Sequence, residues 1–487
     1  MKIYITGLPS GYEVEHLVRL FYPMAPLTLT PPEEGEDCVW AEKKEDSLYA
    51  MVREQGQSRD AAAPLPRPVE AGGETVEFTL ASLTYGLLRS WTGIRPPWGK
   101  MTGVRPVRLI HDKRAAGWTK ADIDRFFLER FDCSRQKYDM AKAIADLQEP
   151  ILKLGSAPKT YSLYLGIPFC PSRCSYCSFV SCNLDRDRKL VQPYVDCLCR
   201  EVEAIREQAD KAGLKLCSIY IGGGTPTTLT AEQLDALLGT VEAAIDLSKL
   251  KEFTVEAGRP ETITYEKLEV LQQHHIARIS INPQSMHAKT LDLIGREHRP
   301  DDIVKAFQRA DWVGIPIVNA DVITGLPEES PADFAETMEA LLALDPENIT
   351  VHTLAVKRAS RLVEVDKDFH YKQGETVKKM LAVAQQKLKA AGFRPYYLYR
   401  QKHMAGAFEN TGYCKGDTPC IYNIRIMEEK QTILALGAGG ISKIYYPDEN
   451  RLERVPNVSN YEIYISRLEE MLDRKEQNIF KEVEKRC

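Results

Sequence analysis

The sequence predicts an α/β protein built around a partial (β/α) barrel, with an N-terminal accessory α/β domain and a C-terminal α+β region. The main observation is that, from about residue 160, short apolar runs alternate with longer segments of helical periodicity. Strand-then-helix units place parallel strands side by side, because each crossover returns the chain to the same edge of the sheet. About six such units follow one another, which is enough for a barrel or partial barrel with its chemistry at the carboxyl ends of the strands.

The elements of this barrel can be assigned in order. We expect strands at residues 162–167, 218–221, 252–256, 278–281, 317–323 and 349–354. Helices fit between them at residues 191–208, 231–244, 300–313 and 331–344. The C-terminal region begins with a helix over 377–390 and closes with another over 461–474. The expected domains are an accessory domain over 1–85, a basic, turn-rich linker with helices over 86–158, the barrel over 159–373, and a C-terminal region over 374–487 that covers the site.

Residues 1 to about 85 suggest short strands joined by loops. Residues 31–37 are rich in Pro and acidic side chains, and residues 61–68 are rich in Ala and Pro, so we expect both to be loops. In the basic segment that follows, Thr-Gly-Ile-Arg-Pro at 92–96 recurs as Thr-Gly-Val-Arg-Pro at 102–106, which we interpret as a linker with solvated charges. Residues 119–154 then have helical periodicity.

Composition and charge exclude several classes of protein. Hydrophobic residues make up 44% and charged residues 27% of the 487, which excludes a disordered chain or a fibre. The 64 Lys and Arg against 69 Asp and Glu give a net charge of -5, so we expect no nucleic-acid partner. No apolar run approaches the roughly 18 to 20 residues that span a bilayer. The N-terminus lacks the apolar core of a secretory signal. We therefore expect a cytoplasmic protein with no membrane span.

Seven of the twelve cysteines lie between positions 170 and 217. In a reducing compartment such a concentration points to metal or redox chemistry. Cys170, Cys174 and Cys177 follow the first barrel strand, separated by three and then two residues, and tight runs of this kind are typical of iron–sulfur clusters. Three ligands would leave one iron of a four-iron cluster open to a small chelating molecule. The alternative is structural zinc, which prefers four protein ligands, and Cys182 would be a fourth at an unusual spacing.

Polar and glycine residues follow the other barrel strands. Gly-Gly-Gly-Thr-Pro-Thr at 222–227 comes after the second strand, where glycine lets the backbone approach a ligand and offer N–H groups to a carboxylate. Glu256, Gln284 and Asp321 follow later strands, with Arg296 twelve residues after Gln284. Because polar residues recur at the ends of several parallel strands, they indicate one common site.

The cysteine loop resembles the cluster motif of radical S-adenosylmethionine (SAM) enzymes, which place an aromatic residue against the adenine where Tyr176 stands here. The resemblance implies a [4Fe–4S] cluster on Cys170, Cys174 and Cys177, whose open iron chelates SAM. In that family an electron from the cluster cleaves the sulfonium bond and yields a 5'-deoxyadenosyl radical, while the protein positions the cofactor. The glycine run resembles the segment that binds the methionine part of SAM.

Segments 164–170, 222–227, 282–285 and 321–327 are similar to the oxygen-independent coproporphyrinogen III dehydrogenase group. The N-terminal extension and the segment from 410–414 through 437–440 resemble the HemZ type within that group. By position in these motifs, contacts with one or two SAM molecules carry over to Tyr164, Tyr176, Gly223, Gly224, Thr225, Glu256, Gln284, Arg296, Asp321, Ile323, Ala355 and Ile441.

This resemblance implies an oxidoreductase of porphyrin and haem biosynthesis, with a tetrapyrrole substrate. The enzyme would oxidatively decarboxylate two propionates of coproporphyrinogen III to give protoporphyrinogen IX, with an electron donor such as flavodoxin or ferredoxin. Since the substrate carries four carboxylates, its pocket should offer cations, and guanidinium suits carboxylate best. The candidates by position are Arg259, Lys357, Arg358 and Arg361.

Two departures from the family pattern leave other functions open. Phe179 stands where the dehydrogenases have a fourth Cys, a feature that the sister haem chaperones share. Residues 422–427 read Tyr-Asn-Ile-Arg-Ile-Met and lack the His and the Tyr-Trp pair of the chaperones' His-Asn-x-x-Tyr-Trp motif, which speaks against a chaperone. The alternatives are a haem-binding carrier of the same family and a radical SAM enzyme that acts on haem.

Overall fold

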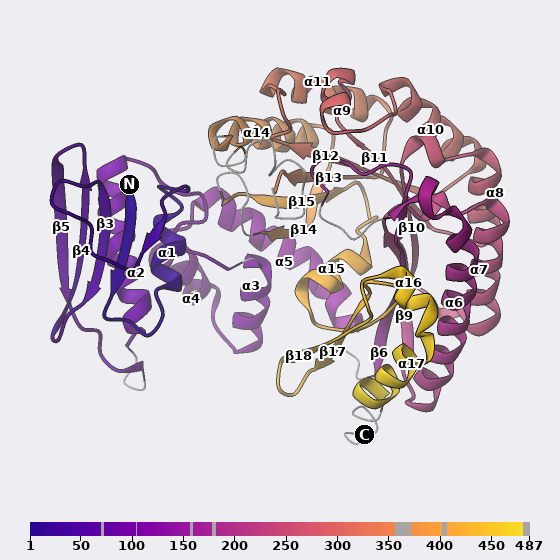
Figure 1. Cartoon of the computed structure of the whole chain (residues 1–487), viewed down its shortest axis with the longest axis horizontal. Coiled ribbons are helices and arrows are strands. Elements are labelled where there is room, and N and C mark those ends of the chain that lie inside the picture. The colour runs from indigo at the N-terminus through magenta and orange to yellow at the C-terminus, as the bar shows by residue number, and fades with distance from the viewer. Residues whose placement is uncertain are drawn as a thin grey trace. The chain divides into compact units, whose positions relative to one another are not determined.

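The computed structural model describes residues 1–69, 73–103, 105–155, 159–177, 182–355, 369, 373–401 and 407–480. The chain divides into two compact units, which are described one at a time (Figure 1). The first comprises Met1–Lys142, Asp368–Gly374 and Arg400–Phe408, and the second comprises Ala143–Lys367, Glu375–Tyr399 and Glu409–Cys487. The expected domain boundaries near residues 85, 158 and 373 stay predictions.

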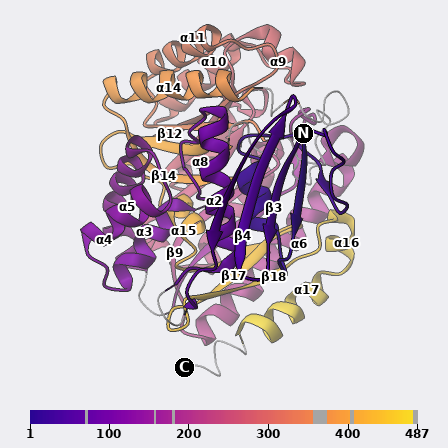
Figure 2. The ribbon, with the colours of Figure 1, turned by 90° about the vertical axis from the view of Figure 1, so that its left-hand side faces the viewer.

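The first unit contains a sheet that two helices cover on one face (Figure 2). Its described strands, in the spatial order β2-β1-β3-β4-β5, are β1 (Lys2–Thr6), β2 (Leu27–Thr28), β3 (Cys38–Lys43), β4 (Ser47–Glu54) and β5 (Gln57–Pro64). The covering helices are α1 (Tyr12–Val18) and α2 (Val76–Thr92). In β4, Leu48, Ala50 and Val52 are buried in this core and alternate with partly exposed residues. This alternation is typical of a sheet with one solvated face.

The prediction of a loop over residues 61–68 is wrong for its first half, because residues 61–64 belong to β5. The strand pairs with β4 from Glu54 and Gln57 to Ser47 and Pro64. Gln55 and Gly56 between them have φ of 52° and 77°, the left-handed region that a two-residue hairpin turn requires. Pairing with a neighbouring strand therefore overrides the weak strand propensity of alanine.

The helical periodicity of residues 119–154 is confirmed. The elements are α4 (Lys120–Arg125), a π-helical turn (Phe126–Arg130) and α5 (Arg135–Gly155), and α3 (Pro106–Ala115) precedes them. Thr119 caps α4 by accepting from the backbone N–H of Asp122, whose carboxylate accepts from the backbone N–H of Thr119 in return. This reciprocal box satisfies two N–H groups that a helix start would otherwise leave open.

The second unit is built on one large sheet. Within the described residues, eleven strands run in the order β14-β15-β13-β12-β11-β10-β9-β6-β16-β17-β18. The strands that the sequence predicts are β6 (Thr160–Ile167), β9 (Lys215–Gly223), β10 (Glu252–Gly258), β11 (Arg278–Gln284), β12 (Ile317–Thr324) and β13 (Asn348–Thr353). The flanking strands are β14 (Arg394–Arg400), β15 (Glu409–Cys414), β16 (Thr432–Leu436), β17 (Ile441–Tyr446) and β18 (Arg451–Pro456). The six predicted strands and β16 are parallel, whereas β15, β17 and β18 join antiparallel. The expected partial (β/α) barrel is confirmed as this open, mainly parallel sheet.

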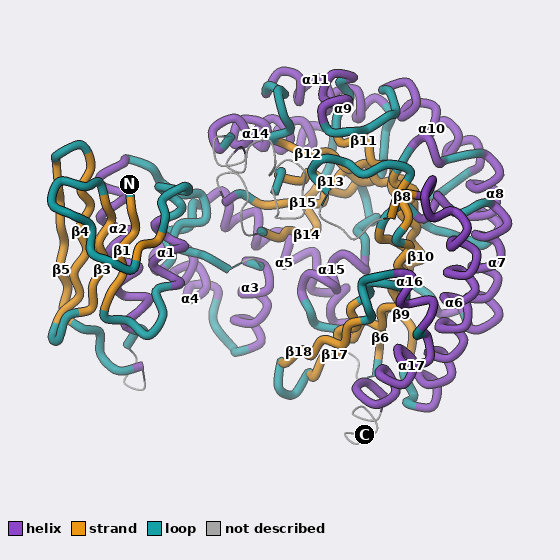
Figure 3. The backbone as a smooth tube through the Cα atoms, viewed as in Figure 1, coloured by secondary structure: helices purple, strands orange, loops and turns teal. Residues whose placement is uncertain are grey.

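Helices line the outer side of the parallel strands (Figure 3). They are α6 (Leu184–Lys211), α7 (Ala231–Ala244), α8 (Tyr265–Gln273), α9 (Ala288–Leu293), α10 (Pro300–Val313), α11 (Pro331–Ala343) and α14 (Gly374–Ala390), followed by α16 (Tyr461–Ser466) and α17 (Leu468–Lys475). Helix α15 (Ile421–Glu428) instead lies on the inner side, where Tyr422 stacks on Tyr220 of β9 with ring centroids 4.4 Å apart. Thr230 and Ser330 cap α7 and α11 through capping boxes. Gly314 ends α10 with a φ of 81°, a left-handed cap that glycine adopts without strain.

The two faces of the parallel sheet differ in chemistry. On β10, Phe253, Val255 and Ala257 are buried in the hydrophobic core that the sheet shares with the helices. Thr254 and Glu256 alternate with them and so point to the other face, because side chains of a strand alternate. Because its side chains include polar ones, the inner face is the candidate location of the functional site. In the part of the chain that the structure describes, no helix is long and apolar enough to cross a membrane.

Candidate functional site

The cysteine loop begins where β6 ends. Cys170 is in the short strand β7 (Phe169–Cys170), which pairs with β8 (Cys182–Asn183). Cys170 and Cys174 are buried, and Cys177 is partly exposed. Backbone hydrogen bonds anchor the loop: Ser175 donates to Ile294 at 3.0 Å, beside the end of α9. Phe179, the departure from the family pattern, lies outside the described residues.

Two buried arginines make the loop electropositive. Arg259 Nη2 donates to Cys174 Sγ at 3.1 Å and to the backbone oxygen of Ser172 at 2.7 Å. Burial alone would raise the pKa of the Cys174 thiol, but the guanidinium groups of Arg296 and Arg259 hold it below its ordinary value. A thiolate is the form that ligates iron. Arg259, a candidate substrate cation by position, is thus engaged with the cysteine loop, and the other candidates, Lys357, Arg358 and Arg361, lie outside the described residues.

The glycine run at the end of β9 packs directly on Cys170. A Cβ at Gly224 would lie 2.5 Å from the Phe169 oxygen and 3.0 Å from Cys170 Sγ, so no side chain fits there. Gly223 has a φ of 116°, a conformation that other residues rarely adopt. Thr225 Oγ1 donates to Cys170 Sγ at 3.7 Å. The cysteine loop and the glycine run therefore form one surface.

Glu256 of β10 lies next to this surface. Its carboxylate accepts from the Tyr220 hydroxyl at 2.6 Å and from the Gly223 N–H at 3.2 Å. Burial, and then the negative charge of Asp321, raise its pKa to about 7. Tyr164 of β6 stacks with Tyr220, with ring centroids 6.3 Å apart.

Arg296 joins the end of β11 to the cysteine loop. Its Nη1 donates to the Asn282 oxygen at 3.0 Å and its Nη2 to the Tyr176 hydroxyl at 3.1 Å. Gln284 is 6% exposed and has a φ of 65°, which is strained for a residue other than glycine. Among the described residues, nothing partners Gln284 Oε1, Asn282 Oδ1 or Arg296 Nε.

Asp321 of β12 has its own partners on the inner face. Asn319 Nδ2 donates to it at 2.7 Å, and His352 Nε2 lies 3.7 Å from its other oxygen. Burial would raise the pKa of Asp321, but the nearby His352 imidazole and the hydrogen bond from Asn319 lower it. The carboxylate is therefore an acceptor at neutral pH.

The structure brings most of the expected residues together by contact. Tyr176, Gly223, Gly224, Thr225, Glu256 and Arg296 are connected through the bonds described above, and Gln284, Asp321 and Ile323 follow on the neighbouring strands β11 and β12. Ala355 lies just beyond β13. Ile441 opens β17, two strands from β6, and is 47% exposed.

Sequence reasoning missed the partners of these residues. Tyr220, Asn319 and His352 each support a carboxylate, and Ser285 donates to the buried Glu329 at 2.5 Å behind Gln284. A usable signal was the two-residue period of the strands, because Tyr220 lies two residues before Gly222 and Asn319 two before Asp321.

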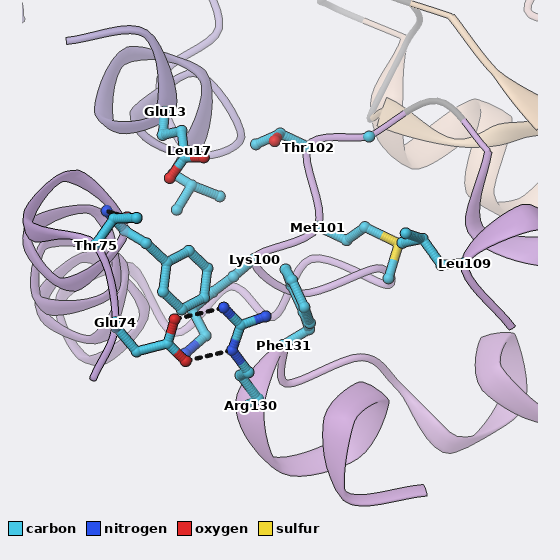
Figure 4. A pocket seen from close by; sticks show the side chains of 12 residues that line it. Glu13, Leu17, Glu74, Thr75, Lys100, Met101, Thr102, Leu109, Arg130 and Phe131 are labelled. Atoms are coloured by element: carbon cyan, nitrogen blue, oxygen red, sulfur yellow. Dashed lines mark hydrogen bonds and ion pairs between the residues drawn. The ribbon is translucent and has the colours of Figure 1, made fainter. Parts of the chain in front are cut away.

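A separate cavity of about 270 Å³ lies within the first unit (Figure 4). Arg130 Nε and Nη2 each donate to Glu74 at 2.5 Å across it, and Phe78 lies under the guanidinium. None of the expected site residues lines this cavity. The inner face of the second unit is therefore the candidate site.

Comparisons with known proteins show the family of the chain. A family model of the radical SAM superfamily matches residues 164–341. The chain is 37% identical over 407 residues to the oxygen-independent coproporphyrinogen-III oxidase-like protein HemZ of Bacillus subtilis. The aligned region covers 82% of this chain and 80% of that protein. The chain belongs to the radical SAM superfamily and to its HemZ group.

The chain is also similar to a heme chaperone and to a solved structure. The heme chaperone HemW of Bacillus subtilis is 31% identical over 238 residues, 48% of this chain and 62% of that protein. The structure of coproporphyrinogen III oxidase (HemN) from Escherichia coli matches with a TM-score of 0.52 at 22% identity, over 67% of this chain and 73% of that one. At this identity the HemN structure supports the fold alone.

The radical SAM family implies a [4Fe–4S] cluster and SAM, and the residues fit both. Three thiols lie in one loop beside two buried cations, as anionic cluster ligands require. The backbone at Gly224 leaves no room for a Cβ beside Cys170. The unpartnered Gln284 Oε1 and Arg296 Nε are groups that a polar cofactor would satisfy. Among the described residues, no three His, Cys, Asp or Glu side chains converge closely enough to hold a single metal ion.

Proposed function

We propose that this radical SAM protein oxidatively decarboxylates two propionates of coproporphyrinogen III and yields protoporphyrinogen IX. The observation that carries the proposal is the surface formed by the cysteine loop and the glycine run at the carboxyl edge of the sheet. The name of its relative HemZ, coproporphyrinogen-III oxidase-like, supports the choice of substrate.

Cys170, Cys174 and Cys177 would hold the cluster. The residues proposed for SAM are Tyr164, Tyr176, Gly223, Gly224, Thr225, Glu256, Gln284, Arg296, Asp321, Ile323, Ala355 and Ile441. When bound, the cluster and SAM supply a carbon radical that removes a hydrogen atom from the substrate. Against the effect of burial, Arg296 and Arg259 lower the pKa of the Cys174 thiol, and Asp321 offers an ionised acceptor for hydroxyl groups.

The reaction balances for each propionate. The β-carbon loses a hydrogen atom, the carboxylate leaves as carbon dioxide, and one electron passes to a one-electron acceptor, so a vinyl group remains. The cluster needs a reductant, for which a flavodoxin or ferredoxin in the cytoplasm is proposed. Two rounds convert two of the four side chains.

Anaerobic turnover tests this proposal. Reconstituted protein, SAM, a strong reductant and coproporphyrinogen III are mixed, and the tetrapyrroles are identified by mass after oxidation. Loss of two carboxyl groups with matching 5'-deoxyadenosine is expected. The variant Cys174→Ala should abolish both products, whereas Cys197→Ala should not, because Cys197 packs against Ile465 on α16. Formation of 5'-deoxyadenosine while the porphyrinogen stays unchanged would reject coproporphyrinogen III as the substrate.

A second candidate function is a haem carrier, which the 31% identity to the heme chaperone HemW favours. A stable Soret band after addition of haem, together with no decarboxylation by a protein with its cluster intact, would support the carrier. Turnover of the porphyrinogen would reject it.

A further inference from the structure

A fully buried ion pair lies beneath the turn that joins β16 to β17. Lys475, the last residue of α17, places its Nζ 2.5 Å from Glu201 Oε1 of α6, and the two side chains are 1% and 0% exposed. Charges without solvent are costly unless every polar atom is satisfied. Here they are satisfied, because Glu201 Oε2 also accepts from the Tyr464 hydroxyl at 2.7 Å.

The pair holds the backbone of the turn, residues 437–440. The N–H of Gly437 donates to Glu201 Oε2 at 2.8 Å. Asn457 bridges the pair and the turn: its Oδ1 accepts from Lys475 at 2.6 Å, and its Nδ2 donates to Glu201 at 3.1 Å and to the Gly437 oxygen at 2.9 Å. Since Gly437 has a φ of 85°, the turn itself depends on a conformation that only glycine adopts readily.

The same turn touches the chain that leads into the cysteine loop. β16 runs parallel to β6 with Leu436 opposite Leu165, so the turn lies at the same edge of the sheet as the loop. The Tyr194 hydroxyl accepts from the Ala438 N–H at 2.9 Å and donates to the Gly166 oxygen at 2.6 Å. Gly166 precedes the first cluster cysteine by four residues, and Ile441, a proposed SAM contact, follows the turn directly.

A purely stabilising role does not account for this arrangement. A buried ion pair is often no more stable than a well-packed apolar pair of the same volume, because desolvation offsets the attraction. What charged, fully bonded side chains provide is one defined arrangement of the groups they bond. Here those groups are the backbone N–H and, through Asn457, the oxygen of Gly437.

We infer that Glu201 and Lys475 are positioning residues that couple the C-terminal helix α17 to the SAM site by fixing the turn at residues 437–440 and, with it, Ile441. The inference rests on the proposed function for the identity of the cofactor. The fixing of the turn itself is independent of that function and can be measured without cofactor.

The first test is hydrogen–deuterium exchange of the cofactor-free protein. The double variant Glu201→Gln/Lys475→Met removes both charges and keeps the side-chain volumes. We expect the Gly437 amide to exchange roughly ten times faster, since its hydrogen-bond acceptor loses its charge. The Ala438 amide, which donates to Tyr194, should also exchange faster because the turn is held less firmly. The control is Glu252→Gln/Arg278→Met, another buried pair, which lies where β10 and β11 begin, at the edge of the sheet opposite to the turn. It should leave these amides unchanged.

The second test is equilibrium dialysis of SAM with the reconstituted proteins. We expect the dissociation constant for SAM to rise about tenfold in the double variant at equal iron content, with the control pair unaffected. Should the double variant fail to fold, Tyr464→Phe can be used, because it removes a single hydrogen bond to Glu201. It should raise the amide exchange rate at the turn and the dissociation constant for SAM by smaller factors.

The outcomes separate the two claims. Unchanged exchange at the turn, or unchanged SAM affinity despite faster exchange, would overturn the positioning role. Absence of SAM binding by the wild-type protein with its cluster intact would instead reject the proposed function.

Discussion

Replacing Glu256 by Gln tests the electrostatics of the inner face. The carboxyl has a usual pKa of 4.5 in the absence of the fold and a pKa of about 7 within it, because of burial and then Asp321. The shift corresponds to roughly 3 kcal/mol at 1.4 kcal/mol per unit. In the native state Glu256 therefore keeps a proton over a range of pH in which the unfolded chain has released it.

The sign of the effect follows from this difference. The stability that Glu256 contributes is fully present below pH 4.5 and is lost as the pH rises through about 7, because the native state binds the extra proton. The Gln side chain of Glu256→Gln does not titrate in this range. As the pH rises from 4 to 8, the free energy of unfolding of the variant should therefore increase relative to that of the wild type by up to about 3 kcal/mol.

The assay is urea unfolding of the cofactor-free proteins across this pH range. Glu329 also has a pKa of about 7, mainly through burial, and it contributes equally to both proteins. The difference between variant and wild type therefore isolates Glu256. A difference in unfolding free energy that stays constant from pH 4 to pH 8 would show that the pKa of Glu256 is not raised by the fold.

Three further changes test the site. Gly224→Ala should cost about 1 to 3 kcal/mol of unfolding free energy and lower the iron bound per chain, since its Cβ would lie 2.5 Å from a backbone oxygen of the cysteine loop. The control is Gly239→Ala on α7, where a Cβ meets open space, and this change should stabilise the protein by up to about 1 kcal/mol. Equal urea midpoints for the two variants would contradict both expectations. Arg259→Met removes the donor 3.1 Å from Cys174 Sγ and should make the cluster's reduction potential more negative in a redox titration; an unchanged potential counts against that contact. Tyr220→Phe removes a hydrogen bond that favours the charged Glu256, so the pH-dependent stability loss should move to higher pH, and no movement would rule out that bond.

Local patterns in the sequence were sufficient for the barrel strands and for the position of the cysteine loop. The strand over Asn348–Thr353 and the helix over Pro300–Val313 follow from apolar periodicity, which depends only on neighbouring residues. Cys170 and Gly224 were both expected at the site because each follows a parallel strand, and such strand ends share one edge.

The contacts that tune the site could not be predicted in this way. Arg259 was expected near the substrate, yet its guanidinium bonds Cys174, because side-chain direction is decided by packing rather than by position along a strand. Glu201 and Lys475 are 274 residues apart, and no local pattern relates them. The strand over residues 61–64 was missed because pairing with β4, and not alanine's own propensity, forms it.

We propose that the cysteine loop and the inner face direct a radical at a porphyrinogen side chain. The most direct measurement uses coproporphyrinogen III that carries deuterium at the propionate β-carbons, under anaerobic turnover with SAM and reductant. We expect 5'-deoxyadenosine that contains one deuterium, formed in step with loss of carbon dioxide. Deuterium-free 5'-deoxyadenosine, with all four carboxylates of the tetrapyrrole intact, would contradict it.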